Sequence, residues 1–282
     1  MAKRVVISHF FNEAYLLPWW LKHHREMFDH GVLIDWSSTD GSADICRQLA
    51  PSWEVVASEN AHFAAILCDF EVMKHEARFP DAWKIALNTT EFLVAPALAH
   101  MEATLERHEL TAVRLPGAIM VDSAPDEAPD PGVPLTQQKQ CGIWEDEFDF
   151  KTYAIPGLTF PTRSRIHHRY VIGAYTPGRH GSHLPGQCAG NRELGAIWWY
   201  GFSPWTDAFK ARKLHISTRR DAFDRKHGFG AQHEAGPSDL EARWSKLSAL
   251  SRPLFPEQLA RDTARAAEGR SVAIPAREVS HG

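Results

Sequence analysis

One stretch decides the fold of this 282-residue chain: Trp83-Lys84-Ile85-Ala86-Leu87-Asn88-Thr89-Thr90-Glu91-Phe92-Leu93-Val94. Its apolar first half is typical of a buried β-strand, and its polar centre predicts a turn. The turn carries one carboxylate, Glu91, beside the neutral side chains of Asn88 and Thr90. Because ligands of parallel α/β sheets bind beyond the carboxyl ends of the strands, this turn is expected to face a ligand.

Strand-like and helix-like segments alternate in the residues that precede this stretch. The short apolar runs that predict strands lie at 5–11, 32–35 and 53–56, and the helical apolar spacings lie at 16–24, 42–49 and 63–77. Such alternation indicates βαβ units. We therefore expect an α/β fold of three layers, with a mostly parallel central sheet flanked by helices.

Polar side chains follow three of the predicted strands. Asn12 and Glu13 follow the first strand, residues 35–40 follow the second, and residues 88–91 follow the fourth. Because the carboxyl ends of parallel strands meet at one edge of a sheet, the three groups should line one crevice. The group at 35–40 has a second interpretation, since Asp and Ser also close turns and cap helices without any ligand.

The second half of the chain is less regular. It contains a predicted helix at 96–108, strands at 112–115 and 151–155, a loop at 122–140 and a helix at 207–220. The predicted organisation is one domain over 1–235, with halves at 1–95 and 96–235, followed by a peripheral helical or frayed tail at 236–282.

Composition excludes several classes of function. A net charge of −4 gives no electrostatic footprint for nucleic acid, so no nucleic-acid partner is expected. The four cysteines are far apart and lack a Cys-x-x-Cys spacing, which favours reduced thiols over disulfides or a zinc site. There is no signal-peptide pattern and no apolar run of about 18 residues, so we expect a cytoplasmic protein without a transmembrane segment.

At three places the sequence resembles family 2-like glycosyltransferases of the GT-A fold. Ser8-His9-Phe10-Phe11-Asn12-Glu13 is similar to that family's strand followed by Asn-Glu. Ile34-Asp35-Trp36-Ser37-Ser38-Thr39-Asp40-Gly41-Ser42 is similar to its Val-Asp-Asp-Gly-Ser-Thr-Asp-Gly-Thr stretch, and Leu87-Asn88-Thr89-Thr90-Glu91-Phe92-Leu93 resembles its Asp-x-Asp-Glu-Phe-Leu strand end. The helix Leu16-Leu17-Pro18-Trp19-Trp20-Leu21-Lys22-His23-His24 resembles a bacterial subgroup. The resemblance covers about a third of the chain.

The resemblance implies an enzyme that moves a sugar from a nucleotide diphosphate donor to an acceptor, with inversion at the anomeric carbon. It also implies that residues 1–95 are the nucleotide-binding half and residues 96–235 the acceptor half of a GT-A-like domain. It implies that Asn12 and Glu13 lie near the base of the donor and that Asp35 bonds the base or the ribose. A carboxylate suits this role because uracil offers an N–H that it can accept. The acceptor implied is a carbohydrate or glycan precursor.

The chain departs from that family at its metal clamp. Asn88 and Thr90 stand where the family has two aspartates that hold Mn²⁺ or Mg²⁺ on the diphosphate, and neutral side chains are poor ligands for these ions. Both remain candidates for binding the nucleotide sugar. Glu91 keeps a charge, which could hold a divalent cation or pair with a basic side chain inside the fold. His183 is the second candidate metal ligand.

Without a metal, basic side chains would have to stabilise the diphosphate, and arginine suits phosphate through bidentate contacts. The candidates in the basic stretch are Arg163, Arg165, His167, His168, Arg169, Arg179, His180 and His183. Of these, His180 is assigned to donor binding. Lys151 is assigned there too, because it resembles a lysine near a strand of related chains. The alternative for this stretch is a solvated basic surface.

An inverting transfer needs one general base near the acceptor hydroxyl. The nearest group of carboxylates is Glu145, Asp146, Glu147 and Asp149, flanked by Trp144 and Phe148. Aromatic neighbours could raise a carboxyl pKa and stack on an acceptor sugar. Asp146 is the predicted catalytic residue.

Two other classes of function compete. The altered clamp is compatible with a pseudoenzyme that binds a nucleotide sugar without turnover. The 16 histidines raise the alternative of a metal-dependent hydrolase, but the chain has no His-Glu-x-x-His helix.

Overall fold

The computed structural model describes residues 3–61, 64–95, 97–125, 127–147, 163–216, 221–227 and 236–254. The elements up to residue 107 are β1 (Arg4–Phe10), α1 (Leu17–Arg25), β2 (His30–Asp35), α2 (Ser42–Leu49), β3 (Glu54–Ala57), α3 (Ala65–Glu76), β4 (Trp83–Ala86), β5 (Glu91–Val94) and α4 (Leu98–Arg107). The later elements are β6 (Ala112–Leu115), β7 (Gly117–Val121), α5 (Leu135–Gln138), β8 (Cys141–Trp144), η1 (Glu145–Glu147), β9 (Arg165–His168), β10 (Gln187–Ala189), β11 (Ala196–Phe202), α7 (Asp207–Ile216), α8 (Ala222–His227), α9 (Pro237–Ser248) and β12 (Arg252–Pro253).

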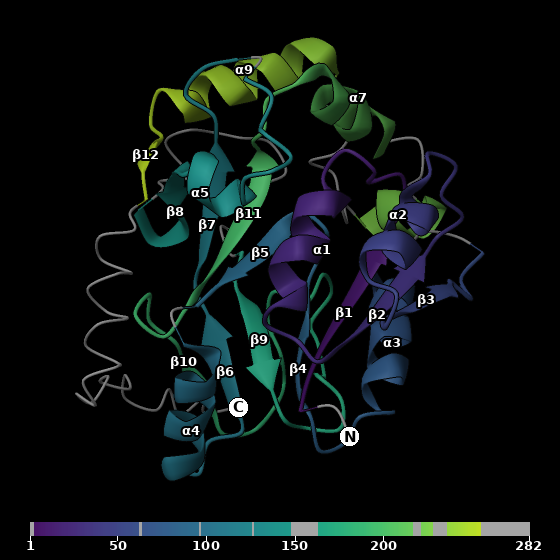
Figure 1. Ribbon diagram of the computed structural model, residues 1–282, viewed down its shortest axis with the longest axis vertical. Coiled ribbons are helices and arrows are strands. Elements are labelled where there is room, and N and C mark those ends of the chain that lie inside the picture. Colours follow the sequence, from purple (N-terminus) through teal and green to yellow (C-terminus); the bar gives the residue numbers. More distant parts are fainter. Residues whose placement is uncertain are drawn as a thin grey trace.

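The central sheet has seven strands in the order β10-β6-β9-β4-β1-β2-β3 (Figure 1). Strand β1 is parallel to β2 and β4, β2 is parallel to β3, and β10 is parallel to β6. Strand β9 runs antiparallel to both β4 and β6. The chain proceeds outward from β1 to β3 on one side and then returns to β4 on the other. Open α/β sheets bind their ligands beyond the carboxyl ends of the strands at such a reversal.

Alternating side chains of the central strands bury both faces of the sheet. Val6 and Leu33 belong to the core that includes α1 and α2, whereas Val5 and Val32 pack in a separate cluster with Val72 of α3. Because successive residues of a strand point to opposite faces, strands covered on both sides are apolar throughout. The predicted α/β architecture, with helices on both faces of a mostly parallel sheet, is confirmed.

The stretch from Trp83 to Val94 forms two strands joined by a turn. Strand β4 belongs to the central sheet, and β5 leaves it to pair antiparallel with β11. A second sheet then follows in the order β12-β8-β7-β11-β5. The turn at residues 88–91, called the clamp turn below, therefore lies where the two sheets separate.

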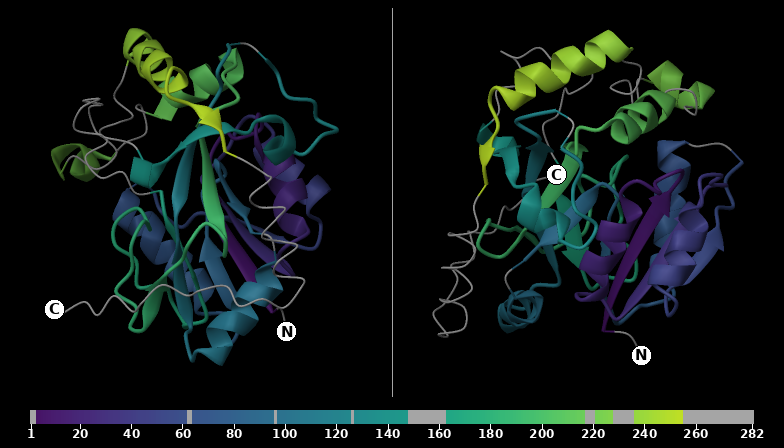
Figure 2. Two further views of the ribbon diagram at one scale, coloured as in Figure 1. Left: turned by 90° about the vertical axis from the view of Figure 1, so that its left-hand side faces the viewer. Right: turned by 45° about the horizontal axis from the view of Figure 1, so that its top comes forward.

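Helices α7 and α9 lie across the end of the sheets toward which β1 runs (Figures 1 and 2). Phe209 of α7 and Leu240 and Leu247 of α9 are buried in one cluster with Val121 of β7 and Trp205. These helices are thus placed over the carboxyl ends of the strands, where a ligand is expected. None of the helices that the structure describes is long and apolar enough to span a membrane.

Candidate functional site

The loops that follow β1 and β2 are bonded to each other. Asn12 has a positive φ of 50°, and its backbone N–H donates to Ser38 Oγ at 3.0 Å. In return, the backbone N–H of Thr39 donates to Asn12 Oδ1 at 2.8 Å. Asn tolerates the left-handed region because its short polar side chain bonds locally. The first two polar groups predicted from the sequence are therefore side by side.

The two aspartates of the second loop differ in how they are bonded. Asp40 accepts from the backbone N–H and the hydroxyl of Ser42 and from the backbone N–H of Ala14, the last at 3.0 Å. It therefore closes the loops, as turn chemistry predicts. Asp35 accepts at Oδ1 from the backbone N–H of Ser38 at 2.9 Å. Its Oδ2 has no hydrogen bond to a described residue, and the side chain is only half-buried.

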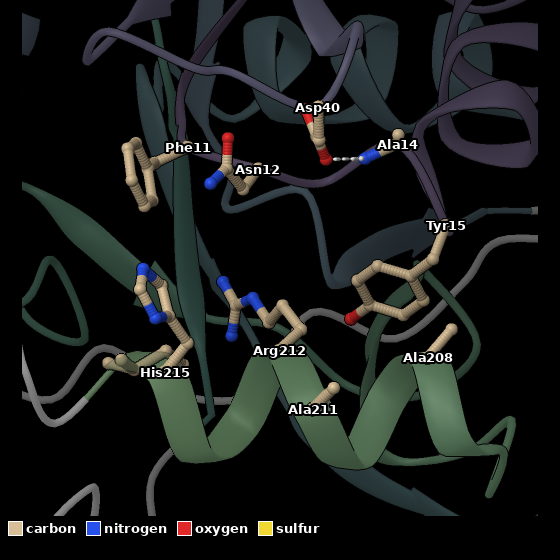
Figure 3. Close-up of a pocket in the computed structure, with 10 residues that line it drawn as sticks. Phe11, Asn12, Ala14, Tyr15, Asp40, Ala208, Ala211, Arg212 and His215 are labelled. Atoms are coloured by element: carbon tan, nitrogen blue, oxygen red, sulfur yellow. Dashed lines mark hydrogen bonds between the residues drawn. The ribbon is translucent and has the colours of Figure 1, made fainter.

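A cavity of about 470 Å³ lies between the loop after β1 and helix α7 (Figure 3). We call it the α7 cavity, and its lining is Phe11, Asn12, Ala14, Tyr15, Asp40, Ala208, Ala211, Arg212, His215 and Ile216. Figure 3 shows Arg212 extending from α7 toward Asn12, between Tyr15 and His215. Glu13 is buried, with 1% of its surface exposed, and forms an ion pair with Arg212. The predicted site residue Glu13 thus holds α7 over the cavity.

The polar groups of the clamp turn form hydrogen bonds and an ion pair with other residues of the protein. Arg165 donates from Nε to Glu91 Oε2 at 2.7 Å and from Nη2 to Glu91 Oε1 at 2.5 Å, and each side chain is 1% exposed. The backbone N–H of Asn88 also donates to Glu91 Oε2, at 2.7 Å. Thr90 is buried and its carbonyl accepts from the backbone N–H of Tyr200 at 2.7 Å.

A second buried ion pair reaches the clamp turn from α3. Arg179 bonds Asp69 at 2.5 Å and donates from Nη2 to Asn88 Oδ1 at 2.8 Å. Burial raises the pKa of the Asp69 carboxyl, while the guanidinium of Arg179 opposes that shift. Helix α3 buries Asp69 and leaves Leu67 and Phe70 exposed. The apolar pattern of α3 therefore does not predict that the Asp69 carboxylate is buried.

The oxygens of the clamp turn do not fit a divalent cation. Both carboxylate oxygens of Glu91 and the amide oxygen of Asn88 already accept from guanidinium groups. Magnesium and manganese prefer free carboxylate oxygens, and a nearby guanidinium repels them. His183, the other predicted metal ligand, is exposed, whereas Glu91 is buried. In the part of the chain that the structure describes, no three His, Cys, Asp or Glu side chains are grouped to hold a metal ion.

Most of the basic stretch contacts carboxylates of the fold. His167 bonds Glu102, His168 bonds Glu76 and Arg169 bonds Glu106, at 3.1, 3.2 and 2.9 Å. The Nδ1 of His180 contacts Arg165 Nη1 at 2.7 Å. Burial lowers the pKa of His180 well below its usual value, and the nearby guanidiniums of Arg165 and Arg163 lower it further, so His180 is neutral.

The predicted base, Asp146, lies on η1 and forms an ion pair with Arg192 at 2.5 Å, with 68% of its side chain exposed. Its neighbour Glu145 accepts from the backbone N–H of Arg163. Burial raises the pKa of Glu145. Both carboxylates line a second cavity of about 260 Å³, called the η1 cavity, with Arg114, Pro116, Ser164, Ala189 and Gly190. Lys151 and Asp149 lie outside the described residues.

Three residues that sequence reasoning did not select lie beside these cavities. Arg212 and Lys213 belong to α7, and Trp199 belongs to β11. The guanidinium of Arg163 lies 4.2 Å and the Lys213 ammonium 4.7 Å from the centroid of the Trp199 ring. The residues before β9 and those of α7 meet only through folding, so no local pattern announces this arrangement.

No protein-family model matches the sequence. No curated protein matches it significantly. Among solved structures, residues 1–349 of S. aureus TarS are 14% identical, with 95% of this chain and 82% of that chain covered and a TM-score of 0.39. A second S. aureus TarS structure is 14% identical with a TM-score of 0.37; the match covers 77% of this chain and 39% of that one. A putative glucose-1-phosphate thymidylyltransferase from Bacillus anthracis, in complex with a sucrose, is 10% identical, with 97% of each chain covered and a TM-score of 0.32.

Proposed function

We propose that this protein is a glycosyltransferase that transfers a sugar from a nucleotide diphosphate donor to a carbohydrate acceptor. The observation that carries the proposal is the α7 cavity, which the loops after β1 and β2 line, next to the point where the strand order reverses between β1 and β4. Open α/β sheets bind their ligands at this reversal. The loops that carry the sequence resemblance, after β1 and β2, form one side of it.

The α7 cavity takes the nucleoside end of the donor. Its volume of about 470 Å³ falls in the range of small-molecule sites. Phe11 and Tyr15 offer ring faces for a base, and Asn12 offers an amide. Asp35 lies in the adjoining loop with an accepting oxygen left over, which suits the N–H of a pyrimidine such as uracil.

The η1 cavity takes the acceptor. Its Ser164 precedes β9, and Arg165 of β9 pairs with Leu115 at the carboxyl end of β6, so this cavity opens at the same edge of the sheet as the α7 cavity. The donor sugar would lie between the two cavities, near the clamp turn. This order places base, diphosphate, sugar and acceptor along one edge.

The transfer would proceed by direct displacement. A carboxylate takes the proton of the acceptor hydroxyl as its oxygen attacks the anomeric carbon, and the nucleoside diphosphate leaves from the opposite side with inversion. Asp146 is the predicted base. Glu145 is a second candidate, because it is more buried and its raised pKa makes it a stronger base than an exposed carboxylate.

One observation favours the alternative of a nucleotide-sugar-binding pseudoenzyme. The clamp turn is bonded to Arg165 and Arg179 rather than left open toward a ligand. A protein with this turn could retain the nucleoside while lacking the charge that assists the leaving group.

The test is to incubate the purified chain with UDP-, GDP-, ADP- and dTDP-linked sugars, with and without Mn²⁺. Binding is measured by calorimetry and the released nucleoside diphosphate by a coupled assay. Binding of one donor with slow release of its diphosphate supports a transferase. Binding without any release, also when acceptor sugars are supplied, favours the pseudoenzyme. Absence of binding by every donor overturns both.

A further inference from the structure

A nucleotide diphosphate brings negative charge that grows on the leaving group as the glycosidic bond breaks. In the family that the sequence resembles, a metal clamp offsets this charge, but the clamp turn of this chain holds guanidinium groups in place of carboxylates open to a cation. Positive charge must therefore come from side chains that reach the space between the two cavities.

Three basic side chains lie close together beside the α7 cavity, and we call them the cationic cluster: Arg163, Arg212 and Lys213. The charges of Arg163 and Lys213 lie 4.2 and 4.7 Å from the centroid of the same ring, Trp199. They are therefore no further apart than the sum of these two distances. Arg212 is next to Lys213 on α7 and lines the α7 cavity.

Lys213 is placed unusually for a lysine. Its ammonium lies near three aromatic rings, at 4.7 Å from Trp199, 5.3 Å from Phe202 and 5.5 Å from Phe209. It has no hydrogen bond or ion pair to any residue that the structure describes. Burial lowers the pKa of Lys213 well below its usual value, and the nearby charge of Arg212 lowers it further. A bound anion would relieve both effects.

Another lysine on the same helix shows the ordinary arrangement. Lys210 lies 5.3 Å from the Trp205 ring and also forms an ion pair with Glu241 at 3.2 Å. The two lysines thus share a helix and an aromatic contact. They differ in that Lys210 forms an ion pair with a carboxylate, whereas Lys213 forms none with the described residues and is affected by the Glu13 carboxylate only through its charge.

We propose that the cationic cluster of Arg163, Arg212 and Lys213 binds the diphosphate of the donor and replaces the divalent cation of a metal clamp. The proposal rests on the proposed function, because it places the diphosphate beside the nucleoside in the α7 cavity. Glu13 acts as a positioning residue, since its ion pair with Arg212 sets where that guanidinium points.

The experiment compares Lys213→Met with Lys210→Met as the matched control. Methionine keeps the apolar stem against the rings and removes the charge. Calorimetric affinities are measured for UDP, uridine and inorganic pyrophosphate, each in buffer with EDTA and in buffer with Mn²⁺. Thermal unfolding of both variants checks the fold; Lys213→Met should be as stable as the parent, because it removes a charge that the site disfavours.

We expect Lys213→Met to lower the affinities for UDP and pyrophosphate by about ten-fold or more, since a charge-assisted contact contributes about that factor. The affinity for uridine should stay unchanged. Lys210→Met should leave all three affinities unchanged. EDTA should leave UDP binding unchanged in the parent protein.

Two results overturn the proposal while leaving the proposed function standing: loss of UDP binding in EDTA with recovery in Mn²⁺, or equal UDP affinity in Lys213→Met and the parent. A third result is pyrophosphate binding that depends on Lys213 while no nucleotide binds. The cationic cluster would then be an anion site, and the proposed function as a nucleotide-sugar enzyme would be wrong. Failure of UDP and pyrophosphate alike to bind overturns the cluster as a diphosphate site.

Discussion

Arg165 and Glu91 form a two-point ion pair at the place where the two sheets of this protein meet. Arg165 is the first residue of β9 in the central sheet, and Glu91 is the first residue of β5 in the second sheet. The two bonds are 2.7 and 2.5 Å long, and both side chains are almost fully buried. The pair therefore fixes the clamp turn to both sheets.

Removing one member of this pair should cost much more than removing both. Arg165→Met leaves the Glu91 carboxylate buried without its partner, and we expect a loss of about 3–5 kcal/mol in the free energy of unfolding. The double variant Arg165→Met with Glu91→Leu should recover a large part of that loss. Urea denaturation measures both. Arg169→Gln, which breaks an exposed ion pair with Glu106, is the control and should cost less than about 1 kcal/mol. Equal losses from Arg165→Met and Arg169→Gln would contradict the structure.

Acid should destabilise the protein through Glu71. Burial alone would raise the pKa of Glu71, but hydrogen bonds from His9, the backbone N–H of Glu59 and the Ser58 hydroxyl outweigh it and lower the pKa from 4.5 to about 2. The folded chain then binds this proton more weakly than the unfolded chain, so the stabilisation is present above pH 4.5 and lost as the pH falls toward 2. The contribution is about 3 kcal/mol.

The measurement is urea denaturation between pH 2 and pH 6, for the parent protein and for Glu71→Gln. The parent should lose stability more steeply over this window, because the variant has no proton to take up there. Parallel curves for the two proteins would show that Glu71 does not carry the acid sensitivity.

Alkali should have the opposite effect through Lys84. This side chain is fully buried, and burial lowers its pKa from 10.5 to about 8. Between these two values the unfolded chain holds one more proton than the folded chain, so the stability contributed by Lys84 rises with pH. Compared with Lys84→Met, the parent should gain about 3 kcal/mol over that window. A constant difference between the two proteins from pH 8 to pH 10 would refute this assignment.

Asp35 should contribute to donor affinity through its remaining oxygen. Asp35→Asn keeps the bond from Ser38 and replaces the second accepting oxygen with a donor, so we expect UDP to bind about ten-fold more weakly. Asp44→Asn changes an exposed carboxylate on α2 and should leave the affinity unchanged. Calorimetry with UDP and with uridine separates a contact to the base from one to the phosphates, and an unchanged uridine affinity in Asp35→Asn would place Asp35 outside the site.

The choice of base is tested by Glu145→Gln and Asp146→Asn. If Glu145 takes the proton, its variant should lower kcat by about 100-fold or more while Asp146→Asn stays near the parent value. Because burial raises the pKa of Glu145 and a base must be ionised, the parent rate should fall with acid at a pH above 4.5. The reverse ranking of the two variants would return the role to Asp146.

The apolar spacing of the first 95 residues was sufficient to predict the central sheet as far as β4 with its flanking helices. The second sheet was not predictable in this way. Its strands come from distant parts of the chain: β5 pairs with β11 about a hundred residues away, at Glu91 opposite Trp199 and Val94 opposite Ala196. Local pattern reports which segments can be strands and does not report which of them will pair.

The candidate site, like the fold, is predicted by the sequence only in part. That the loops after β1 and β2 would lie together followed from the rule for parallel sheets, and the bonds between Asn12 and Thr39 show them together. The sequence did not predict which residues would pair with the charged side chains. The sequence leaves two partners open for Glu91, a divalent cation or a basic side chain. The structure shows that its partner is Arg165. On α3, the exposed Phe70 beside the buried Asp69 reverses what apolarity alone predicts.

Helix α7 presents different residues on two neighbouring faces. Ala208, Arg212 and His215 recur at helical spacing along the α7 cavity, while Lys213 lies over the rings of Trp199 and Phe202 in the second sheet. In the proposed function, a tilt of α7 would change the selectivity for the nucleobase and the affinity for the diphosphate at the same time. An engineer who wished to retune selectivity alone would therefore leave it untouched and vary the opposite wall, at Phe11 and Asn12.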